Sequence, residues 1–251
     1  MVRPRLAADQ WPAAVYAIGD VHGYLQQLQG LEEQILEDGA ALVGEKWIVT
    51  LGDYVDRGPN SAGVIDHLLE PLPDGWRRIA LVGNHDDVLL QYLRDPKTLG
   101  WWLFEGGAET MESYGVDVDR VLEGRDPERT LRDTFKARIP DDHLAFLSSL
   151  PVALSLPRWF FVHAGIRPGV PLDMQSEDDL IWIRSPFLET QRQDDVTVVH
   201  GHTPGREPVI TKWRIGLDTH CFFTGNLTGM RVTPDGRTKL MTASGPVVPW
   251  R

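Results

Sequence analysis

The first part of the chain repeats one unit three times: an apolar run, a glycine, a polar side chain and then a helical pattern. The apolar runs span 14–18, 47–51 and 79–82, and they end at Gly19, Gly52 and Gly83. Helical patterns follow over 24–37, from a candidate cap at Asn60, and over 87–94. Alternation of this kind predicts an α/β fold with parallel strands.

The polar residues after these strands are Asp20, Asp53 and Asn84, which are 33 and 31 residues apart, or one βα unit each. Because the carboxyl ends of parallel strands gather at one sheet edge, these side chains are expected to meet there. Two later apolar runs, 159–162 and 196–199, end at His163 and at His200-Gly201-His202. A lone histidine at a strand end is usually structural, but five polar strand ends together favour a site.

The rest of the sequence predicts further helices and strands around this core. Residues 95–150 read as a helical insertion that walls the site, and their two tryptophans, Trp101 and Trp102, either face substrate or lie in the core. A strand at 215–217 and a hairpin over 229–242 follow. Residues 1–13 are expected to form a loose leader. With no long linker, one domain over 1–251 is expected.

The composition excludes several classes of protein. The net charge of −11 argues against a basic stripe for nucleic acid. The single cysteine, Cys221, cannot form an intrachain disulfide. No signal peptide and no membrane-length apolar run are visible. We therefore expect a cytoplasmic protein without nucleic-acid or membrane partners, and the oligomeric state stays open.

Three motifs carry metal and phosphate chemistry. In Gly19-Asp20-Val21-His22-Gly23, a carboxylate and an imidazole two residues apart can face one side and suit a borderline divalent metal, although a polar loop explains this motif alone equally well.

In the second motif, Asp53 can bridge two metals, and Arg57 offers a planar fork of donors for phosphate. The alternative for Asp56 and Arg57 is a surface ion pair. In the third, Asn84 offers a neutral oxygen and His85 a general acid, or the pair is a helix cap beside a solvated histidine.

The ordered motifs G-D-x-H-G, G-D-x-V-D-R-G, G-N-H-D, H-A-G and G-H resemble those of the calcineurin-like metallophosphoesterase superfamily, from about Ala14 to Met230. Within it, the chain looks most like the bacterial and phage branch of the phosphoprotein phosphatases. The resemblance implies an α/β fold: a β-sandwich of two mixed sheets flanked by helices, with a helical insertion near the active site. It also implies an enzyme that hydrolyses phosphate esters.

The resemblance implies roles for individual residues. The metal ligands would be Asp20, His22 and Asp53 for one divalent ion, and Asp53, Asn84, His163 and His202 for the other. Arg57 and Arg184 would bind the phosphate, with Asn84 beside them. His85 would protonate the leaving oxygen, and Asp56 would orient His85. Arg184 lies in Trp-Ile-Arg where relatives have Trp-Gly-Arg, so a plain surface arginine is the alternative.

Two dications about 3.5–4 Å apart would activate water for in-line attack on phosphorus. They would also supply the positive field that a chain of charge −11 otherwise lacks. Oxygen and imidazole ligands without thiolate fit manganese, iron or zinc, and the resemblance favours Mn²⁺.

The expected substrate is a phosphorylated protein, cleaved at serine or threonine phosphate with dual specificity as an option. The alternative is a small phosphoester, namely diadenosine tetraphosphate, and the remote one is an inactive metal-binding scaffold. Asp56 favours the protein phosphatases, because similar tetraphosphatases carry Ala or Asn there. Asp86 favours the tetraphosphatases but is expected off the metals.

The remaining histidines are predicted to lie outside the metal site. His67 and His143 are expected at the surface, and His200 behind the metal ligands. His220 replaces a glycine of many bacterial relatives and is also expected away from the site.

Overall fold

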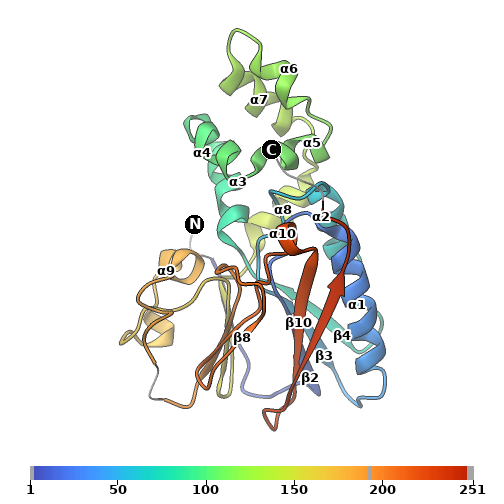
Figure 1. Ribbon diagram of the computed structural model, residues 1–251, viewed down its shortest axis with the longest axis vertical. Coiled ribbons are helices and arrows are strands. Elements are labelled where there is room, and N and C mark those ends of the chain that lie inside the picture. Colours follow the sequence, from blue (N-terminus) through green and yellow to red (C-terminus); the bar gives the residue numbers. More distant parts are fainter. Residues whose placement is uncertain (1–2, 192–193, 248–251) are drawn as a thin grey trace.

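The computed structural model describes residues 3–191 and 194–247, which form two mixed β-sheets flanked by helices (Figure 1). The first sheet has the order β11-β10-β2-β3-β4. Its strands are β2 (Ala14–Ile18), β3 (Lys46–Thr50), β4 (Trp76–Ala80), β10 (Asn226–Val232) and β11 (Thr238–Ser244). The second has the order β1-β5-β6-β7-β9-β8. Its strands are β1 (Arg5–Ala7), β5 (Ala153–Leu156), β6 (Trp159–Val162), β7 (Thr197–His200), β8 (Val209–Ile210) and β9 (Arg214–Gly216). The predicted fold class is confirmed.

Each sheet contains three parallel strands that end at the same level. In the first sheet β2, β3 and β4 are parallel, with Ile18 opposite Thr50 and Thr50 opposite Ala80. In the second, β6, β7 and β9 are parallel. The carboxyl ends of these six strands therefore lie at one edge of the sandwich, where side chains from both sheets can meet.

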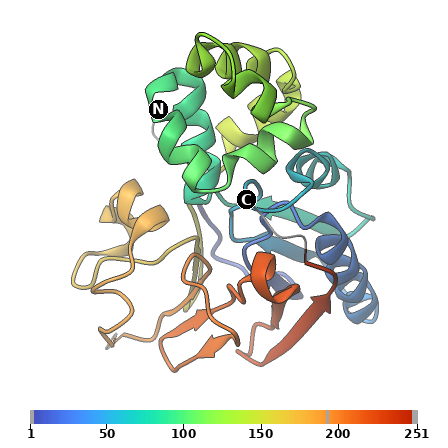
Figure 2. The same cartoon turned by 45° about the horizontal axis from the view of Figure 1, so that its top comes forward.

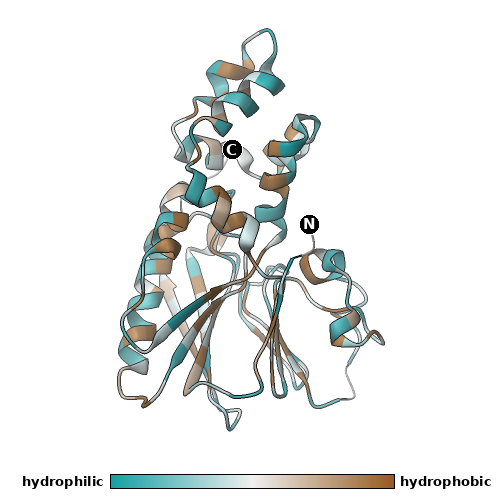
Figure 3. Cartoon of the chain, turned by 180° about the vertical axis from the view of Figure 1, so that it is seen from behind, coloured by the Kyte–Doolittle hydropathy of each residue, from teal (hydrophilic) through white to brown (hydrophobic). Residues whose placement is uncertain are grey.

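The two sheets pack face to face through alternating side chains. Val15 and Ala17 of β2 pack against the second sheet, where Phe161 and Val199 belong to the same buried cluster. The intervening residues of β2 instead face the helices. This alternation follows from the two-residue period of a strand. Figure 3 shows hydrophobic residues recurring along the strands, and mixed colours on the helices that cover them.

Helices join the strands and extend beyond the site edge (Figures 1 and 2). The connecting helices are α1 (Leu25–Gly39), α2 (Ser61–Leu69) and α3 (Asn84–Arg94). The insertion contains α4 (Leu99–Phe104), α5 (Gly107–Ser113), α6 (Val118–Leu122), α7 (Pro127–Lys136) and α8 (Asp141–Ser149), so its predicted helical character is confirmed. Two short helices, α9 (Glu177–Trp182) and α10 (Cys221–Thr224), follow the second-sheet strands β6 and β9. Across 3–191 and 194–247, no helix combines the length and apolarity that a bilayer span requires.

Several boundaries differ from the sequence prediction. The expected leader contains β1, which pairs in parallel with β5; residues 1–2 lie outside the described ranges. The third strand lies at 76–80 because it includes Arg77 and Arg78, which pack over Trp47 and pair with Glu32 and so carry charge without an apolar pattern. Helix α3 begins at Asn84, three residues earlier than predicted, since Asp86 caps it at the Gly83 N–H.

Candidate active site

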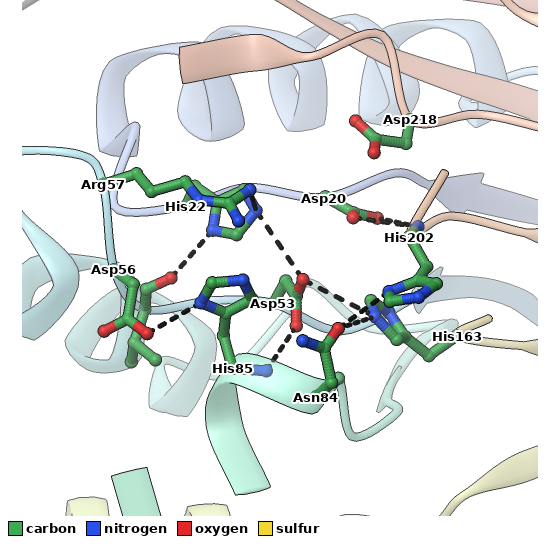
Figure 4. A network of polar contacts seen from close by, with 12 residues as sticks. Asp20, His22, Asp53, Asp56, Arg57, Asn84, His85, His163, His202 and Asp218 are labelled. Atoms are coloured by element: carbon green, nitrogen blue, oxygen red, sulfur yellow. Dashed lines mark hydrogen bonds and ion pairs between the residues drawn. The ribbon is translucent and has the colours of Figure 1, made fainter. Parts of the chain in front are cut away.

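Polar side chains from the ends of both sheets converge on one small volume (Figure 4). They follow β2, β3 and β4 of the first sheet and β6, β7 and β9 of the second. The set is Asp20, His22, Asp53, Asp56, Arg57, Asn84, His85, His163, His202 and Asp218.

Backbone strain marks the same place. Among the described residues, the non-glycine positions with positive φ are His22, Asp53, Asp56, Arg57, Arg158, His202 and His220, and all but Arg158 lie at the site. Such conformations persist where the surroundings fix them, typically at functional sites.

One group of ligand atoms consists of hydrogen-bond acceptors that face each other. His163 donates its Nδ1–H to the Leu51 carbonyl at 2.8 Å, so Nε2 of the neutral ring carries a lone pair. That Nε2 lies 2.9 Å from Asn84 Oδ1 and 3.5 Å from Asp53 Oδ2. Burial lowers the pKa of His163, which favours the neutral ring. Three electron-rich atoms without a proton between them fit a bound cation.

His202 completes this group in the same way. It donates Nε2–H to the Trp182 carbonyl at 3.1 Å and directs Nδ1 at Asn84 Oδ1, 2.8 Å away. Burial, and then the charge of nearby groups, lowers the pKa of His202 to about 2. A histidine that donates one N–H to a backbone carbonyl and offers its other nitrogen is the usual arrangement of a metal ligand.

A second group shares Asp53 with the first. His22 donates Nδ1–H to the Val55 carbonyl at 2.9 Å, and its Nε2 lies 3.6 Å from Asp53 Oδ2. The ligand atoms of His22, Asp53 and His85 lie within 4.8 Å of one another, as do those of Asp53, His163 and His202. Asp53 is thus placed to contribute to two adjacent cation sites.

Asp20 lines the same pocket as Asp53 but, within the described ranges, is not in either group of ligand atoms. Its carboxylate accepts the His202 backbone N–H at 2.9 Å. The buried neighbour Asp218 also faces it. Burial and then repulsion by Asp218 and Asp53 raise the pKa of Asp20 well above its usual range. A dication in the site would offset that repulsion, so Asp20 as a ligand stays a prediction.

His85 and Asp56 form a buried pair beside the cation sites. His85 donates Nδ1–H to Asp56 Oδ2 at 2.8 Å, which leaves Nε2 free to face the pocket. Trp102 Nε1–H and the Thr110 hydroxyl, both from the helical insertion, also donate to the Asp56 carboxylate. Burial alone lowers the pKa of His85, but Asp53 and Asp56 outweigh it, so its pKa is raised. This arrangement suits a proton donor.

Arg57 directs its guanidinium into the pocket, where it faces a carboxylate. Its guanidinium donates to Glu105 at 3.1 Å and lies 4.5 Å above the Phe222 ring. Its Nε is buried and has no hydrogen-bond partner among the described residues. Arg184 is exposed, donates to the His202 carbonyl at 3.3 Å and lines the same pocket as Arg57.

The pocket at this edge has a volume of about 200 Å³. The predicted residues that line it are Asp20, Asp53, Arg57, Asn84, His85, Arg184 and His202. Glu105, Trp182, Pro204, His220 and Phe222 also line it. The predictions for three histidines are wrong. His220 lines the pocket together with Phe222 of α10. His143 is buried against Tyr114, and His67 is only 15% exposed and contacts Glu32.

Other predictions about the site's surroundings hold. His200 is buried with its Nδ1 beside the Gly201 carbonyl, and does not line the pocket. Asp86 lies off the ligand groups: its carboxylate accepts the N–H groups of Asp53, Tyr54 and Gly83, which ties the loop after β3 to the start of α3. Trp102 is a core residue, whereas Trp101 is 41% exposed.

Sequence and structure comparisons agree with this geometry. A relative from Anoxybacillus flavithermus, named bis(5'-nucleosyl)-tetraphosphatase PrpE [asymmetrical], is 24% identical over 92% of this chain and 95% of its own. One of the same name from Oceanobacillus iheyensis is 28% identical over 85% and 86%.

Solved structures show the same fold. A crystal structure named for a candidate diadenosine tetraphosphatase matches with a TM-score of 0.68 and 24% identity, over 98% of this chain and 100% of that one. The cold-active protein-tyrosine phosphatase of a psychrophilic Shewanella matches with a TM-score of 0.57 and 18% identity, over 96% and 82%. The model of the family described as calcineurin-like phosphoesterase matches residues 13–225. The chain therefore belongs to the calcineurin-like phosphoesterases, a family of hydrolytic enzymes.

Proposed function

We propose that the protein is a metal-dependent hydrolase of dinucleoside polyphosphates that cleaves them asymmetrically. The observation that carries the chemistry is the convergence of Asp53, Asn84, His163 and His202 as acceptors without a proton between them. The choice of substrate is supported by relatives named as tetraphosphatases that align over 92% of this chain.

The side chains divide the work of hydrolysis. Two divalent ions, for which we propose Mn²⁺, would supply an activated water and charge neutralisation when bound. The chain would hold one with His22 and Asp53, with Asp20 close by, and the other with Asp53, Asn84, His163 and His202. Arg57 and Arg184 would bind the phosphate oxygens across the pocket, which Asn84 also lines.

His85 supplies the proton for the leaving oxygen. Its Nε2 faces the pocket while Asp56 accepts Nδ1–H, so the ring is fixed in the orientation that donation requires. The Trp102 and Thr110 donors hold Asp56 itself. A terminal phosphate of a nucleotide leaves more readily than a serine alkoxide, so such an acid is most valuable for the poorer leaving group.

The value of a proton donor for a poor leaving group favours a second candidate, a phosphoprotein phosphatase. The buried Asp56–His85 pair is the specific observation behind it. A phosphoserine or phosphothreonine ester has a poor leaving group that gains from a strong proton donor. The relatives' name weighs toward the dinucleotide, and the two candidates share every side chain named above.

The deciding experiment compares substrates on one metal-loaded preparation. Diadenosine tetraphosphate and phosphoserine, phosphothreonine and phosphotyrosine peptides would be offered with Mn²⁺, and again after chelation. We expect kcat/KM at least tenfold higher for the dinucleotide, ATP and AMP as products, and no activity with chelator. Asp53→Asn serves as the blank for contaminating phosphatases.

Other results would change the assignment. A preference for the peptides would establish the second candidate. Two ADP as products would refute asymmetrical cleavage. Undiminished activity in chelator would refute the metal mechanism.

A further inference from the structure

Exposed aromatic side chains gather at the rim of the active-site pocket. Among residues 3–191 and 194–247, the exposed aromatic side chains are Trp101, Phe104 and Phe223, at 41%, 76% and 62% exposure. Each adjoins a pocket-lining residue: Trp101 contacts Trp182, Phe104 precedes Glu105, and Phe223 contacts His220.

Two of these contacts are parallel stacks. The rings of Trp101 and Trp182 lie 5.6 Å apart at 29°, and those of Phe223 and His220 lie 5.3 Å apart at 27°. In each stack the inner ring lines the pocket and the outer ring is exposed to solvent. In a hydrophobic core both rings of such a stack are buried, because a ring exposed to solvent loses the stabilisation that burial provides.

The stacks lie at different ends of the ligand cluster. Trp182 packs edge-on against His202, which belongs to the group of Asp53, Asn84 and His163. His220 packs against Phe222, which in turn contacts the ring of His22 in the other group. Figure 4 shows His22 and His202 on opposite sides of Asp53. Each candidate cation site therefore has its own aromatic stack.

The volume of the pocket limits which part of a substrate can enter it. About 200 Å³ is below the usual 300–1,000 Å³ range of small-molecule sites, so the pocket takes a phosphate group and its metals but not a whole nucleotide. The remainder of a phosphoester must lie over the rim. A flat, apolar group with a polar edge, such as a nucleobase, is what an exposed aromatic ring binds by stacking.

We propose that Trp101 and Phe223 are base-binding residues, one for each nucleoside of a dinucleoside polyphosphate, with Phe104 extending the first surface. This inference rests on the proposed function and names where its substrate binds. Trp101 and Phe104 are three residues apart in α4 and so face the same side of that helix. The polyphosphate between the two bases would cross the pocket, past Arg57 and Arg184.

The first test separates the contribution of the base to binding from that of the phosphate. AMP and ribose 5-phosphate carry the same phosphate and sugar, and only AMP has a base. Calorimetric titration of the Mn²⁺-loaded protein should give tighter binding of AMP by about tenfold, the scale of one base–aromatic stack. At least one of the variants Trp101→Ala and Phe223→Ala should remove that advantage without changing ribose 5-phosphate binding. If Trp101→Ala removes it, Trp101→Phe should retain it.

Diadenosine tetraphosphate gives the second readout. We expect both alanine variants to raise its dissociation constant about tenfold, whereas Leu240→Ala, an equally exposed apolar side chain on β11, should not. The proposal is wrong if AMP and ribose 5-phosphate bind alike to the unaltered protein, or if neither variant affects either adenosine ligand.

The two proposals fail separately. Binding of AMP is measured whether or not the dinucleotide is cleaved. Loss of dinucleotide turnover in the substrate comparison, with base-dependent binding intact, would overturn only the proposed function. Turnover with base-independent binding would overturn only the aromatic sites.

Discussion

Asp53 is the residue on which both groups of candidate ligands depend. It follows β3 in a left-handed conformation (φ 54°), and its Oδ2 lies 3.6 Å from His22 Nε2 and 3.5 Å from His163 Nε2. Gly83 permits this approach, because a Cβ there would lie 2.1 Å from Asp53 Oδ1. A glycine at the end of β4 is therefore part of what places a carboxylate at the end of β3.

Asp53→Asn should remove both metal ions at once. The amide keeps the shape but loses the charge and one of the two acceptor oxygens, so neither group retains its carboxylate. We expect bound Mn²⁺, measured by elemental analysis, to fall from about two per chain to well below one, with turnover lost. His202→Asn should cost one ion only. Exposed Asp133→Asn is the control, and unchanged metal content in Asp53→Asn would contradict the shared role.

Glu105 occupies the place at Arg57 that a substrate phosphate needs. Its carboxylate lies 3.1 Å from the guanidinium and 3.8 Å from His85 Nε2. We expect Glu105→Gln to lower KM for an anionic substrate about fivefold, because a partly buried ion pair contributes on the order of 1 kcal/mol that binding must otherwise break. Initial-rate kinetics measure this, with exposed Glu123→Gln, from the same insertion, as the control. A raised KM would show instead that Glu105 holds Arg57 in its binding position.

The structure brings the ten predicted site residues to one edge of the sandwich. It also places residues there that the sequence analysis missed. Asp218 follows β9 as the other acidic residues follow their strands, so the strand-end rule could have found it. Glu105 could not be found this way, since it comes from a turn between α4 and α5 whose position depends on how the insertion packs. Asp20 also accepts the His202 backbone N–H, a contact with the loop after β7 that its motif does not reveal.

At the scale of elements, the insertion supplies more than a wall. Trp102 from α4 and Thr110 from α5 donate to Asp56, and the Asp56 backbone N–H donates back to the Thr110 hydroxyl at 2.8 Å. Trp102 is fully buried and packs on Tyr92 of α3 and Phe135 of α7, so packing against both helices holds its indole N–H in place. Helices outside the sandwich therefore orient the Asp56–His85 pair at its edge.

Glu32 joins three elements through one carboxylate. It lies in α1, pairs with Arg78 of β4 and contacts His67 of α2, and its side chain is only 5% exposed. Burial raises the pKa of Glu32, but its hydrogen bond with His67 and the charge of Arg78 outweigh burial and lower the pKa. The ion pair therefore stabilises the folded state as long as Glu32 is ionised.

Glu32→Gln should lower the free energy of unfolding by about 3 kcal/mol at pH 7, because it leaves the largely buried Arg78 without its counter-charge. Since the folded pKa of Glu32 is lowered, its contribution is present above the unfolded pKa of about 4.3 and is lost as the pH falls through the folded value. Urea unfolding at pH 7 and pH 3 checks this. Exposed Glu33→Gln is the control, and a difference as large at pH 3 as at pH 7 would refute the ionic origin.

Apolar runs and helical periodicity predicted the buried elements and missed those that are largely exposed. Strands β2 and β6 lie where their apolar runs predict, and α2 begins after its Asn60 cap. Strand β1 has only three residues and an exposed face, so nothing in its sequence separates it from a loop. Its place depends on the edge of β5, which is nearly 150 residues away in the sequence.

At the scale of the whole molecule, the fold concentrates negative charge where a substrate is also negative. Asp20, Asp53 and Asp218 are all buried at the pocket edge of a chain whose net charge is −11. Burial, and then the negative charge of Asp53, raise the pKa of Asp218 to about 6. Such a cluster is compatible with phosphate binding only if cations compensate it. The stability of the fold and the binding of metal should therefore be linked.

Removing metal should lower the melting temperature of the entire protein. A ligand that binds only the folded state at 100 times its dissociation constant contributes about 2.7 kcal/mol. For a chain of 251 residues this corresponds to a shift of roughly 5–10 °C. We expect calorimetric scans in chelator to show that decrease, and added Mn²⁺ to reverse it. Asp53→Asn should melt at one temperature in both conditions because its carboxylate no longer holds either ion, whereas Asp133→Asn should respond like the unaltered protein. A metal-dependent shift that survives in Asp53→Asn would place the stabilising ion elsewhere, and the linkage between the buried carboxylates and the fold would then be wrong.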